Sequence, residues 1–229
     1  MRNLILFGLL IILLLVAQFT SAKTVEDVIE KYLKARGGSN KLAAIKSIYM
    51  EGLIEKAGSQ AIIKITTEQD KLSRINIAWP HENNRVQVAD SVDRTALQTE
   101  LDIDGPLVEY LAKGHKAELL GKEKVEDNTC YKIKLTTKDG NKILLWIDAS
   151  TWLLNQSWVL KTNETSGVKN EVFTLLRNYK DVDGIKFAHT FETRTNAINR
   201  SNDDEEISFN KIILNPHVDP PMYLQNNQS

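Results

Sequence analysis

The strongest constraint on the fold is an alternation of apolar and polar residues that recurs along most of the chain. Successive side chains of a β-strand point to opposite faces of the sheet, so this period of two predicts strands with one apolar face. Ten or eleven short strands joined by turns predict an antiparallel sheet that curls to protect its edges. The segments with this pattern are Ser47–Ile54, Gln60–Thr67, Leu72–Trp79, Arg85–Asp90, Ala117–Val125, Thr129–Thr137, Asn141–Ile147, Leu153–Leu160, Glu171–Tyr179, Ile185–Arg194 and Glu205–Leu214.

Three short helices are predicted beside this sheet. Thr24 can cap the first, which carries apolar residues at helical spacing and stops at Gly37-Gly38. Ser39 can cap the second, and Pro106 stands in the first turn of the third. The first two helices are amphipathic, so each needs an apolar surface to cover.

The predicted sheet supplies such a surface. Within one strand, Tyr131, Ile133 and Leu135 alternate with Lys132 and Lys134, so one face of the sheet is strongly apolar. A few helical turns cover this face incompletely or movably, which leaves room for an apolar ligand between sheet and helices. The alternative is a fully packed core.

The first 22 residues have the pattern of a secretory signal peptide. Arg2 precedes an apolar run, Leu4–Ala17, and the small residues Thr20–Ala22 follow it. The run is shorter than the roughly 20 apolar residues that cross a bilayer, although a retained N-terminal anchor is the alternative. We therefore expect cleavage after Ala22 and a mature single domain, residues 23–229, that is not lipidated because no cysteine lies near the cut.

The charge balance and the polar residues exclude several functional classes. Removing Arg2 with the signal peptide leaves 28 of the 29 Lys and Arg residues against 30 Asp and Glu residues, a net charge of −2, and this gives no electrostatic reason to bind nucleic acid. Cys130 is the only cysteine, so no internal disulfide can form. The four histidines are dispersed, and no nucleophile and base stand at a recognisable spacing. We therefore expect a protein without catalytic activity, metal or cofactor.

The order of these signals resembles the LolA/LolB/LppX-like group, particularly the bacterial outer membrane lipoprotein-sorting proteins. Four segments carry the resemblance: Tyr32–Gly52, Asp104–Gly121, Cys130–Asp148 and Asn178–Phe187. The resemblance implies a mainly β fold, an unclosed antiparallel β-barrel whose concave apolar face is covered by helices. It also implies a periplasmic protein of a Gram-negative bacterium that holds lipid or lipoprotein acyl chains without catalysing a reaction.

The leading hypothesis is a periplasmic carrier or chaperone that takes lipid or acylated lipoprotein from an envelope donor and passes it to an acceptor towards the outer membrane. The rival is a non-catalytic module of the cell envelope that has a packed core and binds a protein through an exposed strand edge. The residues predicted to line the lipid cavity are Ile63, Ile65, Leu107, Tyr110, Leu111, Tyr131, Ile133, Leu135, Trp146 and Trp158.

Overall fold

The computed structural model describes residues 23–69, 74–80, 105–162, 169–196 and 204–216. The predicted signal peptide and the predicted strand Arg85–Asp90 lie outside these ranges. The described elements are α2 (Val25–Arg36), α3 (Ser39–Ala43), β1 (Ser47–Lys56), β2 (Ser59–Glu68), β3 (Arg74–Ala78), β4 (Lys116–Val125), β5 (Asn128–Thr136), β6 (Lys142–Asp148), β7 (Leu154–Thr162), β8 (Lys169–Arg177), β9 (Lys180–Val182), β10 (Ile185–Phe187), β11 (Thr190–Asn196) and β12 (Glu205–Leu214).

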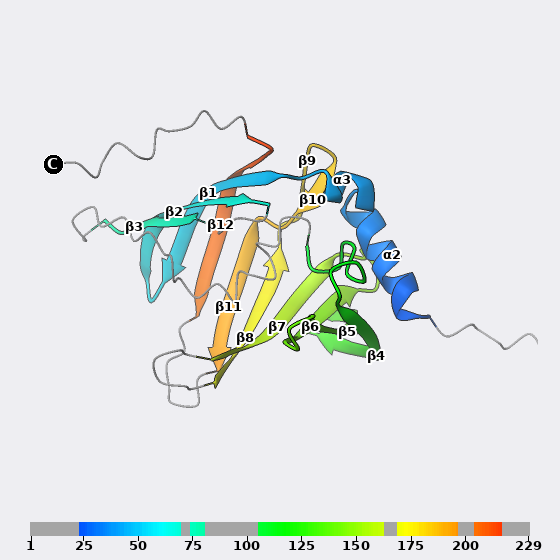
Figure 1. Cartoon of the computed structure of the whole chain (residues 1–229). Helices are drawn as coiled ribbons and strands as arrows, with labels where there is room; N and C mark the ends of the chain where they lie inside the picture. The colour runs from blue at the N-terminus through cyan, green and yellow to red at the C-terminus, as the bar shows by residue number, and fades with distance from the viewer. Residues whose placement is uncertain (1–22, 70–73, 81–104, 163–168, 197–203, 217–229) are drawn as a thin grey trace, which may run out of the picture.

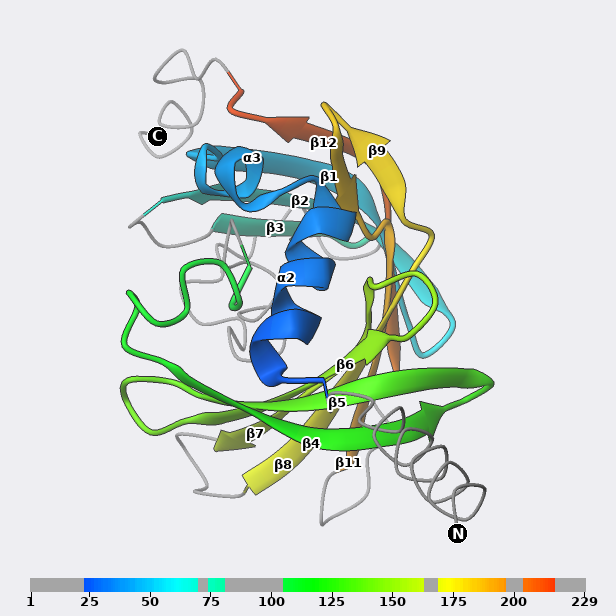
Figure 2. The ribbon, with the colours of Figure 1, turned by 90° about the vertical axis from the view of Figure 1, so that its right-hand side faces the viewer.

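One large antiparallel sheet dominates the molecule (Figure 1). Its ten strands run in the order β3-β2-β1-β12-β11-β8-β7-β6-β5-β4, and β9 and β10 form a separate hairpin. The described strands β3 and β4 stand at opposite edges of this sheet, which therefore does not close. Figure 2 shows the sheet curling around α2, so that α2 lies on the concave side. The predicted fold, a half-barrel with helices on its concave face, is confirmed.

The alternation of the strands builds two buried clusters on the concave face. The first core cluster contains Leu42 of α3 and Ile63 of β2. The second core cluster contains Tyr32 of α2 and Ile133 of β5. Leu33 of α2 is partly buried and packs against both clusters, so this one helix connects the two halves of the core.

Helix α2 begins and ends as its sequence predicts. The Thr24 hydroxyl accepts a hydrogen bond from the Asp27 amide, and the Asp27 carboxylate accepts one from the Thr24 amide. At the other end Gly37 has φ 129°, and its amide donates back to the last turn of the helix. The next helix, α3, differs slightly from the prediction, because Gly38 is its N-cap and Ser39 is its first helical residue.

The segment after Pro106 is not the helix that the sequence predicts. Residues 106–114 form successive turns, and Glu109 has a left-handed φ of 48°, which interrupts a right-handed helix. The backbone instead closes with the Lys113 amide donating to the Glu109 carbonyl and the His115 amide donating to the Tyr110 carbonyl.

The predicted strand Ile185–Arg194 is divided between two sheets. Asp183 and Gly184 both have positive φ, as a tight hairpin turn requires, and they fold Ile185–Phe187 back onto β9. From Thr190 onward the chain joins the large sheet between β8 and β12. The alternation continues through the whole segment, so it does not reveal the change of partner.

Candidate functional site

The concave face brings together seven of the ten residues predicted to line a cavity. All seven are at most 9% exposed. The first core cluster contains two of them, and the second contains the other five. In the order of the chain they are Ile63, Ile65, Leu107, Tyr110, Tyr131, Ile133 and Leu135.

Leu111 was predicted to line the same cavity, but the structure contradicts this. Its side chain is 69% exposed, whereas Leu107 is 1% exposed. The prediction assumed that residues 107 and 111, four apart, share one face of a helix. Because the segment forms turns, that spacing no longer places both side chains on one side.

The two predicted tryptophans lie on the convex face of the sheet, opposite Ile133. Across the strands Trp146 pairs with Lys132, whereas Ile133 pairs with Leu145, and paired residues share a face. Trp146 is buried in a third cluster, against which Trp158 packs. The prediction that both tryptophans line the concave cavity is therefore wrong. Strand β6 is apolar on both faces, so its alternation could not assign Trp146 to either one.

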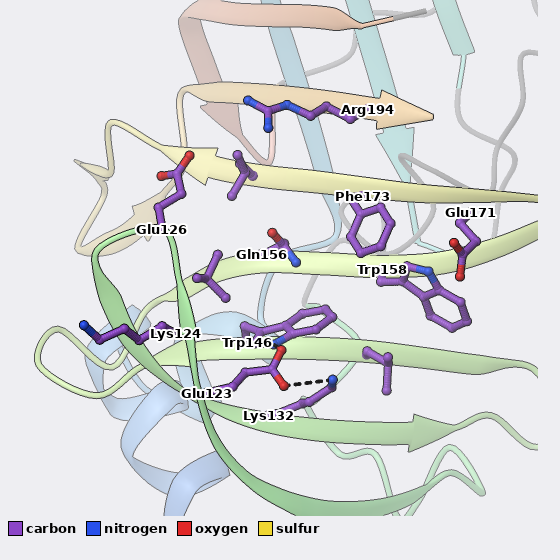
Figure 3. Close-up of a pocket in the computed structure, with 13 residues that line it drawn as sticks. Glu123, Lys124, Glu126, Lys132, Trp146, Gln156, Trp158, Glu171, Phe173 and Arg194 are labelled. Carbon is purple, nitrogen blue, oxygen red and sulfur yellow. Dashed lines mark hydrogen bonds and ion pairs between the residues drawn. The ribbon is translucent and has the colours of Figure 1, made fainter. Parts of the chain in front are cut away.

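The convex tryptophans line a groove of about 480 Å³, which we call the outer groove (Figure 3). Its base holds Trp146, Trp158 and Phe173, and charged side chains surround them. Lys132 pairs with Glu123 across two neighbouring strands at 3.0 Å, which closes one side of the groove. Sequence reasoning did not single out Glu123 or Phe173, because nothing local in the sequence shows that they flank the tryptophans.

Glu123 is held by two donors in the outer groove. The Trp146 indole Nε1 donates to Glu123 Oε1 at 2.5 Å, and Lys132 Nζ donates to Glu123 Oε2 at 3.0 Å. Burial raises the pKa of Glu123, but these two hydrogen bonds and the lysine charge outweigh it, and the pKa lies below its usual value. The carboxylate is thus a satisfied structural group.

Helix α2 is attached to the sheet by polar contacts at its two ends. Before its first turn, Lys23 Nζ donates to the Tyr131 hydroxyl at 2.8 Å. In its last turn, Arg36 Nε donates to the Lys186 carbonyl at 3.2 Å, and the guanidinium lies 5.2 Å from the centre of the Phe187 ring. Between these ends the helix contributes a single buried stripe to the concave face.

Two titratable side chains of the described residues, Cys130 and His189, are buried, and the described residues contain no candidate metal site. No group of three or more His, Cys, Asp or Glu residues in it could hold a metal ion. The Cys130 thiol is fully buried, and burial followed by the nearby Asp148 carboxylate raises its pKa to about 11. The His189 ring, also buried, is hydrogen-bonded to the Phe187 carbonyl.

Comparison with solved structures identifies the architecture. A LolA superfamily protein from Nitrosomonas europaea has a TM-score of 0.52 and 14% sequence identity, covering 84% of this chain and 94% of that protein. The chain has a LolA-like fold. A DUF1329 family protein from Desulfovibrio piger has a TM-score of 0.50 and 12% identity, covering 86% of this chain and 95% of that protein.

A third LolA-like structure is a putative outer membrane lipoprotein-sorting protein domain from Vibrio parahaemolyticus. Its TM-score is 0.47 and its identity 12%, with 85% of this chain and 93% of that domain covered. No family profile and no curated protein matches the sequence. In the described residues of this LolA-like chain, no helix has the length and apolar character to cross a membrane.

Proposed function

We propose that this LolA-like protein is a periplasmic carrier that binds the acyl chains of a lipid or lipoprotein between α2 and the concave face of the sheet. It acts without catalysis, as one domain over residues 23–229, and passes its cargo towards the outer membrane. The observation that carries the proposal is that one amphipathic helix connects both apolar clusters of an open half-barrel.

An acyl chain can compete with α2 for the concave face. The buried stripe of α2 consists of Val28, Ile29 and Tyr32. Apolar side chains such as the first two contribute about 1.5–3 kcal/mol each when buried. Burial of an acyl chain contributes about 0.8 kcal/mol per methylene, or about 12 kcal/mol for a chain of about sixteen carbons. A bound chain can therefore offset the loss of the α2 contacts.

The lining of the proposed site consists of the seven concave residues named above. Trp146, Trp158 and Leu111 are not part of it, because two lie on the convex face and the third is exposed. Release of the cargo requires an acceptor that buries the acyl chains at least as well, because the energy gained in the carrier must be replaced elsewhere.

Native mass spectrometry of the mature protein purified from the periplasm tests the proposal, with a denatured sample to identify any released lipid. A stoichiometric lipid or acylated peptide supports it. A ligand-free mass, together with no uptake of lipid offered at micromolar concentration, refutes it. A stable complex with an envelope protein would then favour the interaction module.

Two neighbouring residues on the edge strand β4 provide matched variants for this test. Leu119 packs against the second core cluster, and Leu120 is 45% exposed. A charge at the first position would face the bound acyl chain, whereas a charge at the second would face solvent. We expect L119E to lose retained lipid and L120E to keep it, with circular dichroism confirming that both variants are folded. Equal retention in the two variants would contradict the concave site.

A further inference from the structure

A group of three lysines surrounds one stacked aromatic pair at the start of α2. The rings of Tyr131 and Trp152 stack with their centres 5.3 Å apart. Lys23 Nζ lies 4.8 Å from the first ring centre and 4.2 Å from the second. Lys31 Nζ lies 4.7 Å from the Trp152 ring, and Lys122 Nζ lies 4.7 Å from the Tyr131 ring. We call these five residues the lysine cluster.

Segments that are far apart in the sequence meet in the lysine cluster. Lys23 precedes α2, Lys31 lies within it, and Trp152 follows β6 in the turn to β7. Figures 1 and 2 both show the start of α2 beside β4 and β5. Lys122 and Tyr131 are cross-strand partners on β4 and β5 and so share the concave face.

A β-bulge decides the direction of Lys122. The register between β4 and β5 shifts between Leu119 and Gly121, and Gly121 has φ 111°. Before the bulge Leu119 lies opposite Ile133 on the concave face, and after it Lys122 takes that face. Regular alternation would send Lys122 to the other face, so the bulge is what brings its ammonium group to the aromatic pair.

The lysine cluster brings three ammonium groups together beside one apolar pair of rings. None of its three ammonium groups forms an ion pair with a carboxylate of the residues that the structure describes. The first turn of α2 carries two acids, Glu26 and Asp27, and the Asp27 carboxylate accepts a hydrogen bond from the Thr24 amide in the helix cap. Cleavage after Ala22, as predicted, would add the α-ammonium group of Lys23. Like charges held around one site favour a bound anion.

The positive charge of the lysine cluster affects the pKa of the Tyr131 hydroxyl. Burial raises its pKa, but the hydrogen bonds and charges of Lys23 and Lys122 outweigh burial and bring the pKa below its usual value. The Tyr131 side chain is only 5% exposed and belongs to the second core cluster. One residue therefore connects the apolar interior to the cationic group.

We propose that the lysine cluster binds the phosphate group of a phospholipid whose acyl chains occupy the concave face. Ammonium groups bind phosphate oxygens through short, charge-assisted hydrogen bonds, and those of Lys23, Lys31 and Lys122 gather around the same aromatic pair. The position of Tyr131 places the proposed headgroup site directly beside the proposed acyl site. This inference rests on the proposed carrier function, and it adds a preference for cargo with a phosphate group.

Lipid-binding measurements on the mature protein test the preference. The probes are phosphatidylglycerol, diacylglycerol with the same acyl chains, and inorganic phosphate alone. The test variant is K31Q/K122Q, and the control is K34Q/K116Q, which removes an exposed lysine from each of the same two elements, α2 and β4. We expect wild type and the control to prefer phosphatidylglycerol, and the test variant to bind it about tenfold more weakly with diacylglycerol binding unchanged.

The outcomes separate this inference from the carrier function. Equal binding of phosphatidylglycerol and diacylglycerol by the wild type, or an equal loss in both double variants, would overturn the phosphate site and leave the carrier intact. Failure of the wild-type protein to bind either lipid would refute the carrier function. Binding of inorganic phosphate alone, lost in K31Q/K122Q, would retain the anion site but refute the lipid headgroup as its source.

Discussion

The replacement of Gly37 by alanine should loosen the attachment of α2 to the sheet. A Cβ atom at this position would lie 2.5 Å from the Gly184 carbonyl oxygen, well inside an ordinary contact of 3.4 Å or more. Gly37 also has φ 129°, a conformation that costs a residue with a side chain about 1–3 kcal/mol. Both effects act where α2 meets the β9–β10 hairpin.

The size of the effect follows from what must move. Relieving the overlap separates the end of α2 from the hairpin and stretches the 3.2 Å hydrogen bond from Arg36 to the Lys186 carbonyl. Losing that bond costs about 0.5–1.5 kcal/mol. Together with the backbone term, we expect G37A to lower the free energy of unfolding by about 2–4 kcal/mol.

The neighbouring glycine is a matched control. Gly38 has φ 97°, but a Cβ atom there would meet nothing within 4 Å, so G38A carries only the backbone cost. Urea unfolding compares the two variants, and hydrogen exchange of the α2 amides detects local opening. If G37A and G38A lose the same stability and protect α2 equally, the contact with Gly184 does not hold the helix, and the reasoning fails.

Three further predictions concern the core, the thiol and the outer groove. Ile133→Ala should lower the free energy of unfolding by about 2–4 kcal/mol, because Ile133 is fully buried. Leu111→Ala should change it by less than about 0.5 kcal/mol, because the Leu111 side chain is 69% exposed. Thermal unfolding of the two variants compares these effects. Because Cys130 is buried and its pKa is about 11, its thiol should resist a maleimide reagent at neutral pH in the folded protein. The thiol should react fully once the protein is unfolded in urea. Fast labelling without urea would contradict its burial. The folded-state pKa of Glu123 lies below its unfolded value, so its contribution to stability is present above the unfolded pKa and is lost as pH falls through the folded pKa. Glu123→Gln should flatten this acid-side loss and change Trp146 fluorescence, and an unchanged stability–pH profile would rule the contribution out.

Local sequence patterns determined most of the secondary structure. The alternation located most strands of the large sheet to within a few residues, because a half-buried strand must repeat every two residues, but it did not predict β9 or the break between β10 and β11. The Thr24 capping box and the two glycines after Arg36 located the ends of α2, because both act within a single turn of the chain. Residues such as Ile133 and Leu135 were correctly expected on one apolar face, since their strand is polar on the other.

Tertiary structure decided the features that depend on a partner distant in the sequence. The sequence could not assign Trp146 to a face because β6 is apolar on both sides, and its pairing with Lys132 places its side chain on the convex face. After Pro106 the apolar spacing predicted a helix. The left-handed φ of Glu109 interrupts a right-handed helix, and the segment forms turns instead.

The lysine cluster also depends on contacts between segments that are distant in the sequence. A one-residue bulge brings Lys122 to Tyr131, and the packing of α2 then adds Lys23 and Lys31. Period and capping are short-range properties that a sequence carries by itself. The face that a strand turns to a partner, and the charges that meet there, depend on register between segments tens of residues apart, which only the folded chain specifies.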